Sequence, residues 1–269
     1  MGQDLVTRAV PSATVDALYH VGFSADDLDA GTRIALLSGD PERSEHIATA
    51  HLADGRVLAR NRGLDAFAAR LPSGVPVVCA TSGMGAPSAS IVVNELVQAG
   101  IHTIIRIGTT GSIQADLPVG TVVIASAALC EHGAALDIAP DRYPSVADPF
   151  LTVALPEAAT GLGVDHRVGI VASVDTFYEG QERAESSANP HLVRRLVGKI
   201  DEYEHLRVLS FEMEAGTLFT MGSVYGVRTG AVLAVVAQRH EAEAPDLSAK
   251  GAAVDAAIRV AIDAAVASA

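Results

Sequence analysis

The chain has 269 residues, of which 49% are hydrophobic and only 4% aromatic, and its formal net charge is -13. This length suits one large domain with a core of Val, Ala, Ile and Leu, and the acidic balance argues against a broad basic surface for nucleic acid. No apolar run reaches the roughly 18 residues of a membrane-spanning helix, and the N-terminus lacks the apolar core of a secretory signal, so we expect a cytoplasmic protein with no membrane partner.

Strand-like and helix-like segments alternate along the chain after a loosely organised lead-in over residues 1–30. Strands are expected at residues 32–39, 67–71, 75–80, 102–108, 121–129, 166–174, 208–214 and 229–238. Helices are expected within residues 39–51, 88–100, 151–163, 215–226 and 246–269, and residues 181–206 form a polar, helix-prone insertion. The turn Pro-Ser-Gly between the second and third strands predicts a hairpin. Alternation without a composition break predicts one α/β domain with a mostly parallel or mixed sheet.

Two cysteines, Cys79 and Cys130, lie in the apolar runs VPVVCA and TVVIASAALC. Such a pair in a protein without a secretory signal predicts two reduced, buried thiols. No CxxC motif and no Cys/His cluster suggests zinc, so the sequence predicts no metal.

Three glycine-rich loops follow predicted strands: SGDPER (38–43), TSGMGAPS (81–88) and IGTTGSIQ (107–114). In open α/β sheets, ligands gather beyond the carboxyl ends of the strands. Glycine lets backbone N–H groups approach an anion, and a following helix N-terminus adds its dipole. Each loop alone also fits an ordinary strand-to-helix turn. None of the loops matches G-x-G-x-x-G or a Walker A motif, which disfavours dinucleotides and ATP.

Arginines beside these loops indicate an anion site. Arg43 follows Gly39 by four residues, and Arg106 lies inside an apolar strand, two residues before Gly108. A guanidinium in such a strand is costly unless it is paired. Arg106 is therefore either half of a buried salt bridge or a clamp for phosphate. Arg62, taken alone, reads as a surface arginine.

The segment SFEMEAG (210–216) carries two carboxylates, Glu212 and Glu214, at a predicted strand end. Two residues apart on a strand, they can point to one side, with Met213 facing the other way if the strand is regular. Such acceptors suit ribose hydroxyls. A solvated strand edge and a glycosidase acid/base pair are the alternatives.

The segment SVDTFYEGQER (173–183) combines Phe177 and Tyr178 with Gln181 and Arg183. The glutamine offers a donor and an acceptor, whereas the arginine offers donors only. Together with a stacking ring, they match the acceptor–donor–acceptor edge of uracil. An aromatic-anchored loop with a surface charge is the alternative.

Taken in order, GDPER, TSGMGAPS, RIGTTGSIQ, SVDTFYEGQER, FEMEAGTLFTM and VVAQRHEAE resemble the bacterial uridine phosphorylases, within the nucleoside phosphorylase and nucleosidase superfamily. The resemblance runs from about residue 17 to the end, so we divide the chain into an N-terminal extension (1–16) and a nucleoside phosphorylase domain (17–269). It implies a single α/β domain whose central mixed, mostly parallel, twisted sheet forms a distorted barrel flanked by helices. The implied reaction is phosphorolysis of uridine to uracil and ribose 1-phosphate, a pentosyltransferase activity of pyrimidine salvage.

The resemblance also implies a role for each matching residue. Phosphate would be held by Gly39, Arg43, Arg106 and Thr109, with Arg62 from a neighbouring subunit. Ribose would be held by Met213 and Glu214, with His20 from a neighbouring subunit; His20 alone would read as an ordinary histidine. The base would contact Thr110, Gly111, Phe177, Gln181, Arg183, Glu212 and Arg239. The groups expected to act in catalysis are Arg106, Glu214, Gln181 and Arg183.

This sequence departs from the patterns of related enzymes at two positions. Purine-cleaving relatives carry an aspartate near Gln238 and Arg239, and its absence disfavours purines. Some uridine phosphorylases bind a monovalent cation through a glutamate where this chain has Gly63, so we expect no such ion and no other cofactor. Uridine and phosphate are the expected partners, in a hexamer built as a trimer of dimers. The alternatives are a nucleosidase that uses water, a non-catalytic nucleoside sensor, and a purely structural α/β protein.

Overall fold

The computed structural model describes residues 17–239 and 247–268. The expected extension over residues 1–16, and the HEAE part of the VVAQRHEAE motif, therefore lie outside the described residues.

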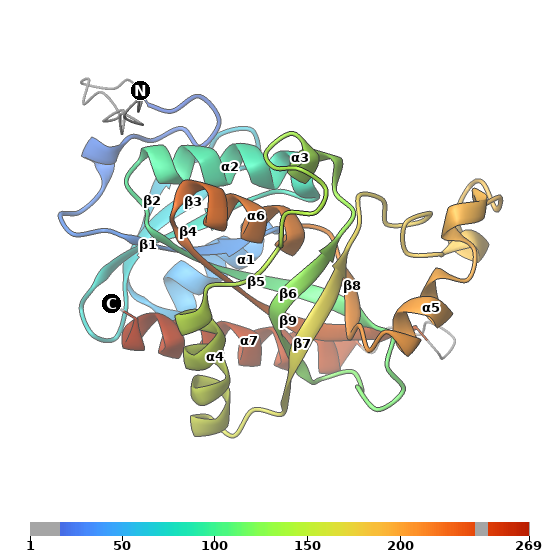
Figure 1. The fold of residues 1–269 in the computed structure, drawn as a ribbon. Helices are drawn as coiled ribbons and strands as arrows, with labels where there is room; N and C mark the ends of the chain where they lie inside the picture. Colours follow the sequence, from blue (N-terminus) through green and yellow to red (C-terminus); the bar gives the residue numbers. More distant parts are fainter. Residues whose placement is uncertain (1–16, 240–246, 269) are drawn as a thin grey trace, which may run out of the picture.

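The described residues form one nine-stranded mixed sheet, shown in Figure 1. Its strands are β1 (Ile34–Ser38), β2 (Ala53–Ala59), β3 (Ala66–Arg70), β4 (Pro76–Thr81), β5 (Thr103–Ser112), β6 (Val122–Cys130), β7 (His166–Ser173), β8 (Ser210–Glu212) and β9 (Arg228–Gln238). Their order is β2-β3-β4-β1-β5-β8-β7-β6-β9. The strand β5 also pairs with β9, which closes β5, β8, β7, β6 and β9 into a barrel. The α/β domain with a barrel-forming mixed sheet is thus confirmed.

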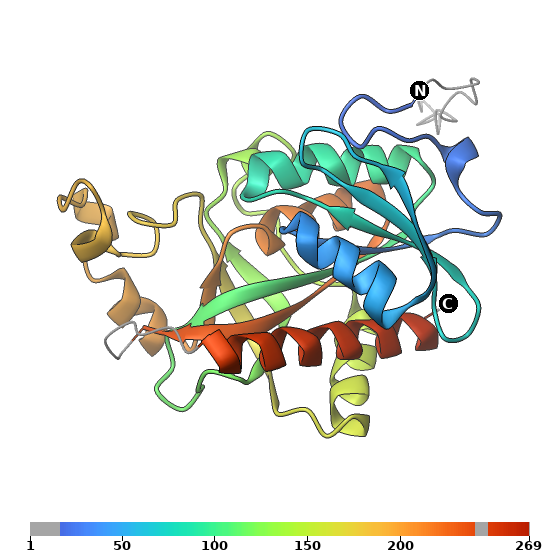
Figure 2. The same cartoon turned by 180° about the vertical axis from the view of Figure 1, so that it is seen from behind.

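Seven α-helices flank the sheet in the part of the chain that the structure describes. They are α1 (Pro41–His46), α2 (Ala86–Gln98), α3 (Gly133–Leu136), α4 (Pro149–Gly161), α5 (Lys199–His205), α6 (Ala215–Tyr225) and α7 (Leu247–Ala267). A π-helical turn, η2 (Ile47–His51), continues α1. In Figure 1, α2 and α6 lie above the sheet and α7 runs beneath it, and Figure 2 shows α1 coming down beside α7.

The alternation of side chains along β1 shows how the two layers are joined. All five residues of this strand are buried. Ile34 and Leu36 pack in the hydrophobic cluster that contains α7 and α4. Ala35 and Leu37 pack in the other cluster, with α2 and α6. A strand covered by helices on both faces has to be apolar throughout, which is why it reads as an uninterrupted hydrophobic run.

Most predicted elements are confirmed, including the β3–β4 hairpin and the helix-prone character of the insertion over residues 181–206, but one strand was missed and one ends early. The exposed edge strand β2 was missed, because its sequence ADGRVLA has no regular alternation and its pairing with β3 has two register shifts. The strand β8 ends at Glu212 rather than at residue 214. The insertion over residues 181–206 forms only short helical segments: η3 (Ala184–Ser186), η4 (Arg194–Leu196) and α5.

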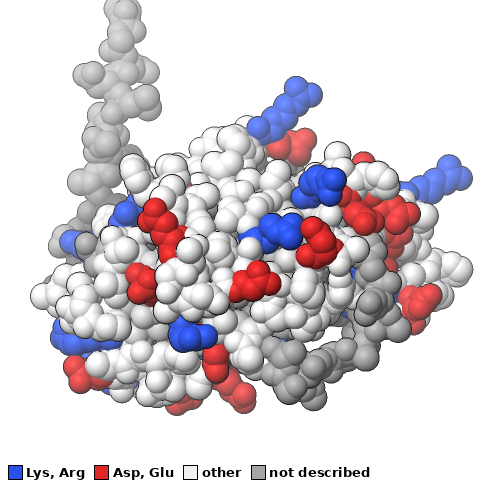
Figure 3. Space-filling model, turned by 90° about the horizontal axis from the view of Figure 1, so that it is seen from below, with Lys and Arg blue, Asp and Glu red and all other residues white. Residues whose placement is uncertain are grey.

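The cysteine prediction holds in part: both thiols are free, but Cys130 is only half-buried, whereas Cys79 lies in the core. None of the helices in the described ranges is long and apolar enough to cross a bilayer. On the face seen in Figure 3, acidic and basic side chains are scattered among uncharged ones. That face offers no continuous basic track of the kind that follows a nucleic-acid backbone.

Candidate active site

A cavity of about 730 Å³ opens at the carboxyl ends of the central strands. The strands β1, β5 and β9 run parallel, so their carboxyl ends lie at the same edge of the sheet. The loop after β1, the end of β5, the end of β9, the β8–α6 turn and the 177–183 loop all contribute to its wall. A cavity of this size fits a small-molecule ligand.

Twelve of the fifteen residues predicted from the sequence line this cavity. They are Gly39, Arg43, Arg106, Thr109, Thr110, Gly111, Phe177, Gln181, Arg183, Glu212, Met213 and Glu214. Arg62, His20 and Arg239 are not among its lining residues. Segments separated by more than a hundred residues are thereby brought to one place.

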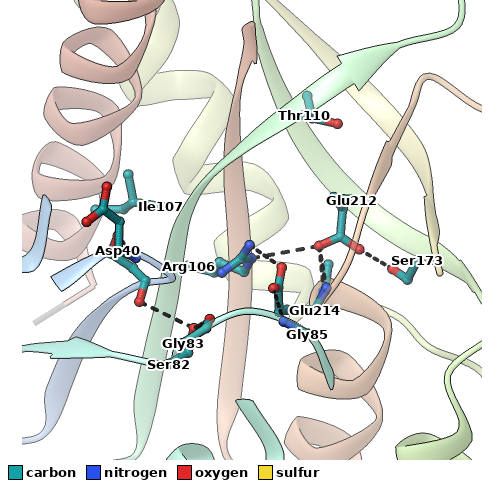
Figure 4. Close-up of polar contacts among 12 residues, drawn as sticks. Asp40, Ser82, Gly83, Gly85, Arg106, Ile107, Thr110, Ser173, Glu212 and Glu214 are labelled. Atoms are coloured by element: carbon teal, nitrogen blue, oxygen red, sulfur yellow. Dashed lines mark hydrogen bonds and ion pairs between the residues drawn. The ribbon is translucent and has the colours of Figure 1, made fainter. Parts of the chain in front are cut away.

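Arg106 is the central charge of the site. Its side chain is 5% exposed; Nη2 donates to the carboxylate of Glu214, and Nε lies 3.7 Å from Oε2 of Glu212. Figure 4 shows the guanidinium pointing toward these two carboxylates. The atoms Nε and Nη1 are buried and have no hydrogen-bond partner among the described residues. Arg106 is therefore both half of a buried ion pair and a source of unused donors, since a guanidinium carries five N–H groups.

A second guanidinium lies near the first. Arg43, on α1, donates through Nη1 to the Ile107 carbonyl oxygen at 3.4 Å and to Oγ of Ser38 at 3.5 Å. Burial lowers the pKa of Arg43; Asp40 opposes this shift, and the like charge of Arg106 adds to it. Two neighbouring cations beside the glycine loop at Gly39 are stabilised by an anion between them, which relieves their repulsion.

The carboxylates of Glu212 and Glu214 are held in different ways. Glu212 accepts from the hydroxyl of Ser173 and from the backbone N–H groups of Glu214 and Ala215, the latter two at 2.9 and 2.7 Å. Glu214 accepts from the Gly85 N–H at 2.6 Å and from Arg106. Two of these hydrogen bonds come from the β8–α6 turn and the third comes from Ser173 at the end of β7, so Glu212 ties the turn to the neighbouring strand and positions Glu214 and Arg106.

The predicted orientation of Met213 depended on a regular strand, and the structure does not have one at this residue. The chain leaves the strand at Glu212, and Glu214 is already the N-cap residue of α6, with φ -141° and ψ -28°. Strict alternation therefore does not apply, and Met213 lines the same cavity as its two neighbours.

The opposite end of the cavity carries Gln181 and Arg183, which are 4% and 8% exposed. The Nε of Arg183 donates to Oε1 of Gln181 at 3.3 Å, and the guanidinium lies 4.2 Å from the ring centroid of Phe177. Arg239 lies behind them and donates through Nη2 to the Gln181 carbonyl oxygen at 3.0 Å. The polar edge is thus preorganised, with Arg239 supporting the loop.

Two residues of β5, Thr110 and Gly111, shape the wall of the cavity beside Arg183 and Arg239. The hydroxyl of Thr110 donates to the Phe211 carbonyl oxygen at 2.7 Å, which ties β5 to β8. A Cβ on Gly111 would lie 3.4 Å from Cδ of Arg239 and 3.6 Å from Nη2 of Arg183. The bare backbone at residue 111 therefore lets both arginines approach the strand.

Sequence reasoning missed several lining residues. Asp40, Gln238 and Lys250 also face the cavity. Asp40 carries a local signal, because it caps α1 by accepting from the Glu42 N–H at 3.0 Å. Lys250 belongs to the C-terminal helix, and no motif in that alanine-rich segment distinguishes it.

His20 and Arg62 lie together, away from the cavity of their own chain. Asn61 donates to the carbonyl oxygens of Tyr19 and His20, and Arg62 lies 5.6 Å from the ring centroid of Tyr19. The ring of His20 is held by Glu95, with Nδ1 2.6 Å from Oε1. Within their own chain, neither residue lines the cavity.

Comparisons with known proteins agree with this arrangement. The model of the Phosphorylase superfamily matches residues 33–267. The uridine phosphorylases of Salmonella typhimurium and Escherichia coli are 41% and 40% identical over 249 residues, which cover 92% of this chain and 96% of each relative. The uridine phosphorylase of Thermococcus kodakarensis is 38% identical over 240 residues, which cover 89% of this chain and 84% of the relative. The chain therefore belongs to the phosphorylase superfamily.

Proposed function

We propose that this protein catalyses the phosphorolysis of uridine, giving uracil and ribose 1-phosphate. The observation that carries the proposal is the buried, unused Nη1 of Arg106, which lies beside Arg43 at one end of a cavity whose other end presents Gln181 and Arg183. Phosphate suits the first end, because guanidinium groups and glycine amides bind it well. A pyrimidine suits the second, and Glu214 lies between them for the ribose hydroxyls. The similarity to uridine phosphorylases supports the same assignment.

In this reaction, phosphate attacks the anomeric carbon of the ribose while the bond to uracil breaks through an oxocarbenium-like sugar. Arg43, Arg106, Thr109 and the Gly39 amide orient the phosphate. Orientation of this kind contributes roughly 7–11 kcal/mol in favourable cases. Glu214 and Met213 hold the ribose. The negative charge of Glu214 lies beside the sugar, where positive charge develops.

The leaving uracil gains negative charge as the bond breaks. Donors at its edge strengthen their hydrogen bonds in the transition state, so they lower the barrier. Gln181 and Arg183 supply these donors, and Phe177 packs against the ring. Since Arg183 already contacts Phe177, the ring and the guanidinium act as one preformed wall. The reaction needs no covalent intermediate and no cofactor besides the co-substrate phosphate.

The direct test is a nucleoside panel assayed with and without phosphate, read by release of the free base. We expect uracil and ribose 1-phosphate from uridine only when phosphate is present, and slower cleavage of inosine. Uracil release that continues without phosphate would instead identify a nucleosidase. Inosine cleaved faster than uridine would overturn the assignment of the base site.

Replacing Gly108 by alanine is expected to weaken phosphate use. A Cβ at residue 108 would lie 2.8 Å from Cδ2 of Leu233 and 3.1 Å from Nη2 of Arg106. Such overpacking costs about 1–3 kcal/mol of stability and displaces the guanidinium. We expect a lower Tm and a higher KM for phosphate, with a smaller change in the KM for uridine. The matched control is Gly161→Ala in α4, where a Cβ meets nothing within 4 Å; equal effects of the two variants on phosphate KM would contradict the argument.

We propose that the active site is completed across a dimer interface, within a hexamer built as a trimer of dimers. His20 and Arg62 support this, because they adjoin each other but do not line the cavity of their own chain. In this arrangement Arg62 adds a positive charge to the neighbour's phosphate, and His20 reaches the neighbour's ribose.

Subunit mixing tests the shared site. Arg62→Ala and Arg106→Lys are each expected to be nearly inactive alone. In a mixed dimer, one of the two sites combines an intact Arg106 from one subunit with an intact Arg62 from the other. Random mixing should therefore restore about a quarter of the parent activity. If the mixed sample is no more active than the separate variants, the shared-site proposal is wrong.

The remaining assignments follow from the same site. We propose that no monovalent cation is bound beside Arg62, because Gly63 supplies no carboxylate. We further propose a cytoplasmic role in pyrimidine salvage. We propose no nucleic-acid partner, since the chain carries a net charge of -13. Residues 17–269 are proposed as the catalytic domain.

A further inference from the structure

Two histidines and an aspartate converge on the surface outside the cavity. His46 ends α1, His51 ends the π-helical turn η2, and Asp255 lies on α7. The two Nε2 atoms are 3.2 Å apart, and Oδ1 of Asp255 lies 3.5 Å from Nε2 of His46 and 3.6 Å from Nε2 of His51. Each residue thus presents one metal-ligand atom to a common point.

The spacing of these three atoms matches that of ligands around one small cation. In a triangle with sides of 3.2, 3.5 and 3.6 Å, one point lies about 2 Å from every corner. Zinc bonds to histidine nitrogen and carboxylate oxygen are about 2.0–2.2 Å long. A tetrahedral ion therefore fits over this triangle with little movement.

The backbone between the histidines is irregular in a way that brings them together. Residues five apart on a regular α-helix are about 140° apart around the axis, because each residue advances about 100°. The π-helical turn Ile47–His51 widens the helix here, and its larger turn carries His51 back toward the face of His46. Single π-helical turns occur frequently at functional sites.

The surroundings favour a neutral imidazole at His51 and an open fourth position. Burial lowers the pKa of His51, and the neighbouring His46 lowers it further; Asp255 acts in the opposite direction, and Arg259 adds to the lowering. A neutral imidazole is the form that binds a metal. The side chains of His46 and Asp255 are 51% and 54% exposed, against 18% for His51, so solvent reaches the point where the three atoms meet.

We propose that His46, His51 and Asp255 bind one divalent transition-metal ion of the zinc class, with water as the fourth ligand. Two imidazoles and one carboxylate suit Zn²⁺ and Co²⁺ better than Ca²⁺ or Mg²⁺, which prefer oxygen ligands. The ion joins α1 to α7. Arg43 lies three residues before His46, and Lys250 lies five residues before Asp255, and both line the cavity. The metal therefore clamps two elements of the active-site wall without taking part in the reaction.

The test is titration of the chelator-treated full chain with Zn²⁺ by calorimetry, and with Co²⁺ by visible absorption. We expect one ion per chain, a Co²⁺ spectrum of four-coordinate type, and a zinc-dependent rise in Tm. His51→Gln and Asp255→Asn should weaken binding by more than about tenfold, since losing even an outer-shell partner of a ligand costs 10–100-fold. Affinity should also fall on acidification, as protons compete for the imidazoles.

The matched control is His102→Gln, an exposed histidine outside the cluster, which should bind zinc like the parent. Circular dichroism and the Tm without metal establish that each variant is folded. The proposal is overturned if the parent binds no zinc, or if folded His51→Gln and Asp255→Asn bind it as tightly as His102→Gln does.

Discussion

Replacing Arg106 by lysine is expected to lower kcat/KM for phosphate by about 10²–10³-fold, the usual effect of losing one well-placed transition-state donor. Lysine keeps the positive charge but not the planar fork of donors. It therefore replaces at most part of the contact with Glu214 and has no equivalent of the buried Nη1. Initial rates at varied phosphate and saturating uridine measure this loss.

Arg106→Ala should lose stability as well as activity. The guanidinium is paired with Glu214 and lies beside Glu212, and all three side chains are buried. Removing one partner of a buried ion pair leaves an uncompensated charge and costs about 3–5 kcal/mol. Thermal or urea unfolding of the alanine and lysine variants separates the two roles: the lysine variant should retain more stability and still lack activity.

The control for Arg106 is Arg60→Ala. Arg60 also makes two ion pairs, with Glu45 and Asp65, but its side chain is half exposed. Exposed pairs contribute little, so we expect activity and stability close to those of the parent. An Arg106→Lys enzyme with nearly normal phosphate dependence would remove Arg106 from the phosphate site.

Gln181→Ala is the second substitution for which we expect a large loss, about 10²–10³-fold in kcat/KM for uridine. The amide is buried, and its Oε1 accepts from Nε of Arg183. Alanine removes the amide that faces the base and also leaves Nε of Arg183 without this acceptor. Because the donors act on the charge of departing uracil, the loss should appear in kcat as well as in KM.

A substrate comparison makes this prediction specific. Some uridine analogues have a leaving base that stabilises negative charge better than uracil does. Cleavage of such an analogue depends less on hydrogen-bond donors from the enzyme. The defect of Gln181→Ala should therefore shrink with such an analogue, while the defect of Arg106→Lys should not. Gln98→Ala, on the exposed face of α2, is the matched control and should behave like the parent. A uniform rise in KM, with kcat unchanged for all substrates, would mean that Gln181 only binds the base.

The sequence alone predicted the fold class, which the structure confirms, and most of the residues that it proposed for the site line one cavity. Strand β1, the β3–β4 hairpin and helix α6 are encoded by local hydrophobic pattern and by glycine stops, which act over a few residues. The glycine loops beside Arg43 and Arg106 also form a local pattern, and they predicted an anion site. Bare amides together with guanidinium groups are unusual near an apolar strand. The predicted residues after β1 and on β5 meet because these parallel strands bring their carboxyl ends to one edge. The predicted residues after β7 and β8 reach the same cavity because the barrel closes, with β8 antiparallel to β5.

Only the tertiary structure decided what each charge contacts. The sequence left Arg106 open between a salt bridge and a phosphate clamp. The fold shows the ion pair with Glu214, and it leaves the buried Nη1 without a hydrogen-bond partner among the described residues, which is compatible with the proposed clamp. The early end of β8 placed Met213 in the cavity, and the C-terminal helix brought Lys250 there. His46 and His51 are spaced as H-x4-H, which lies within the range that zinc sites use, but one such pair has too few ligands to predict a site. Asp255 joins them only through the packing of α7 beside the π-helical turn, a long-range contact that no local pattern encodes.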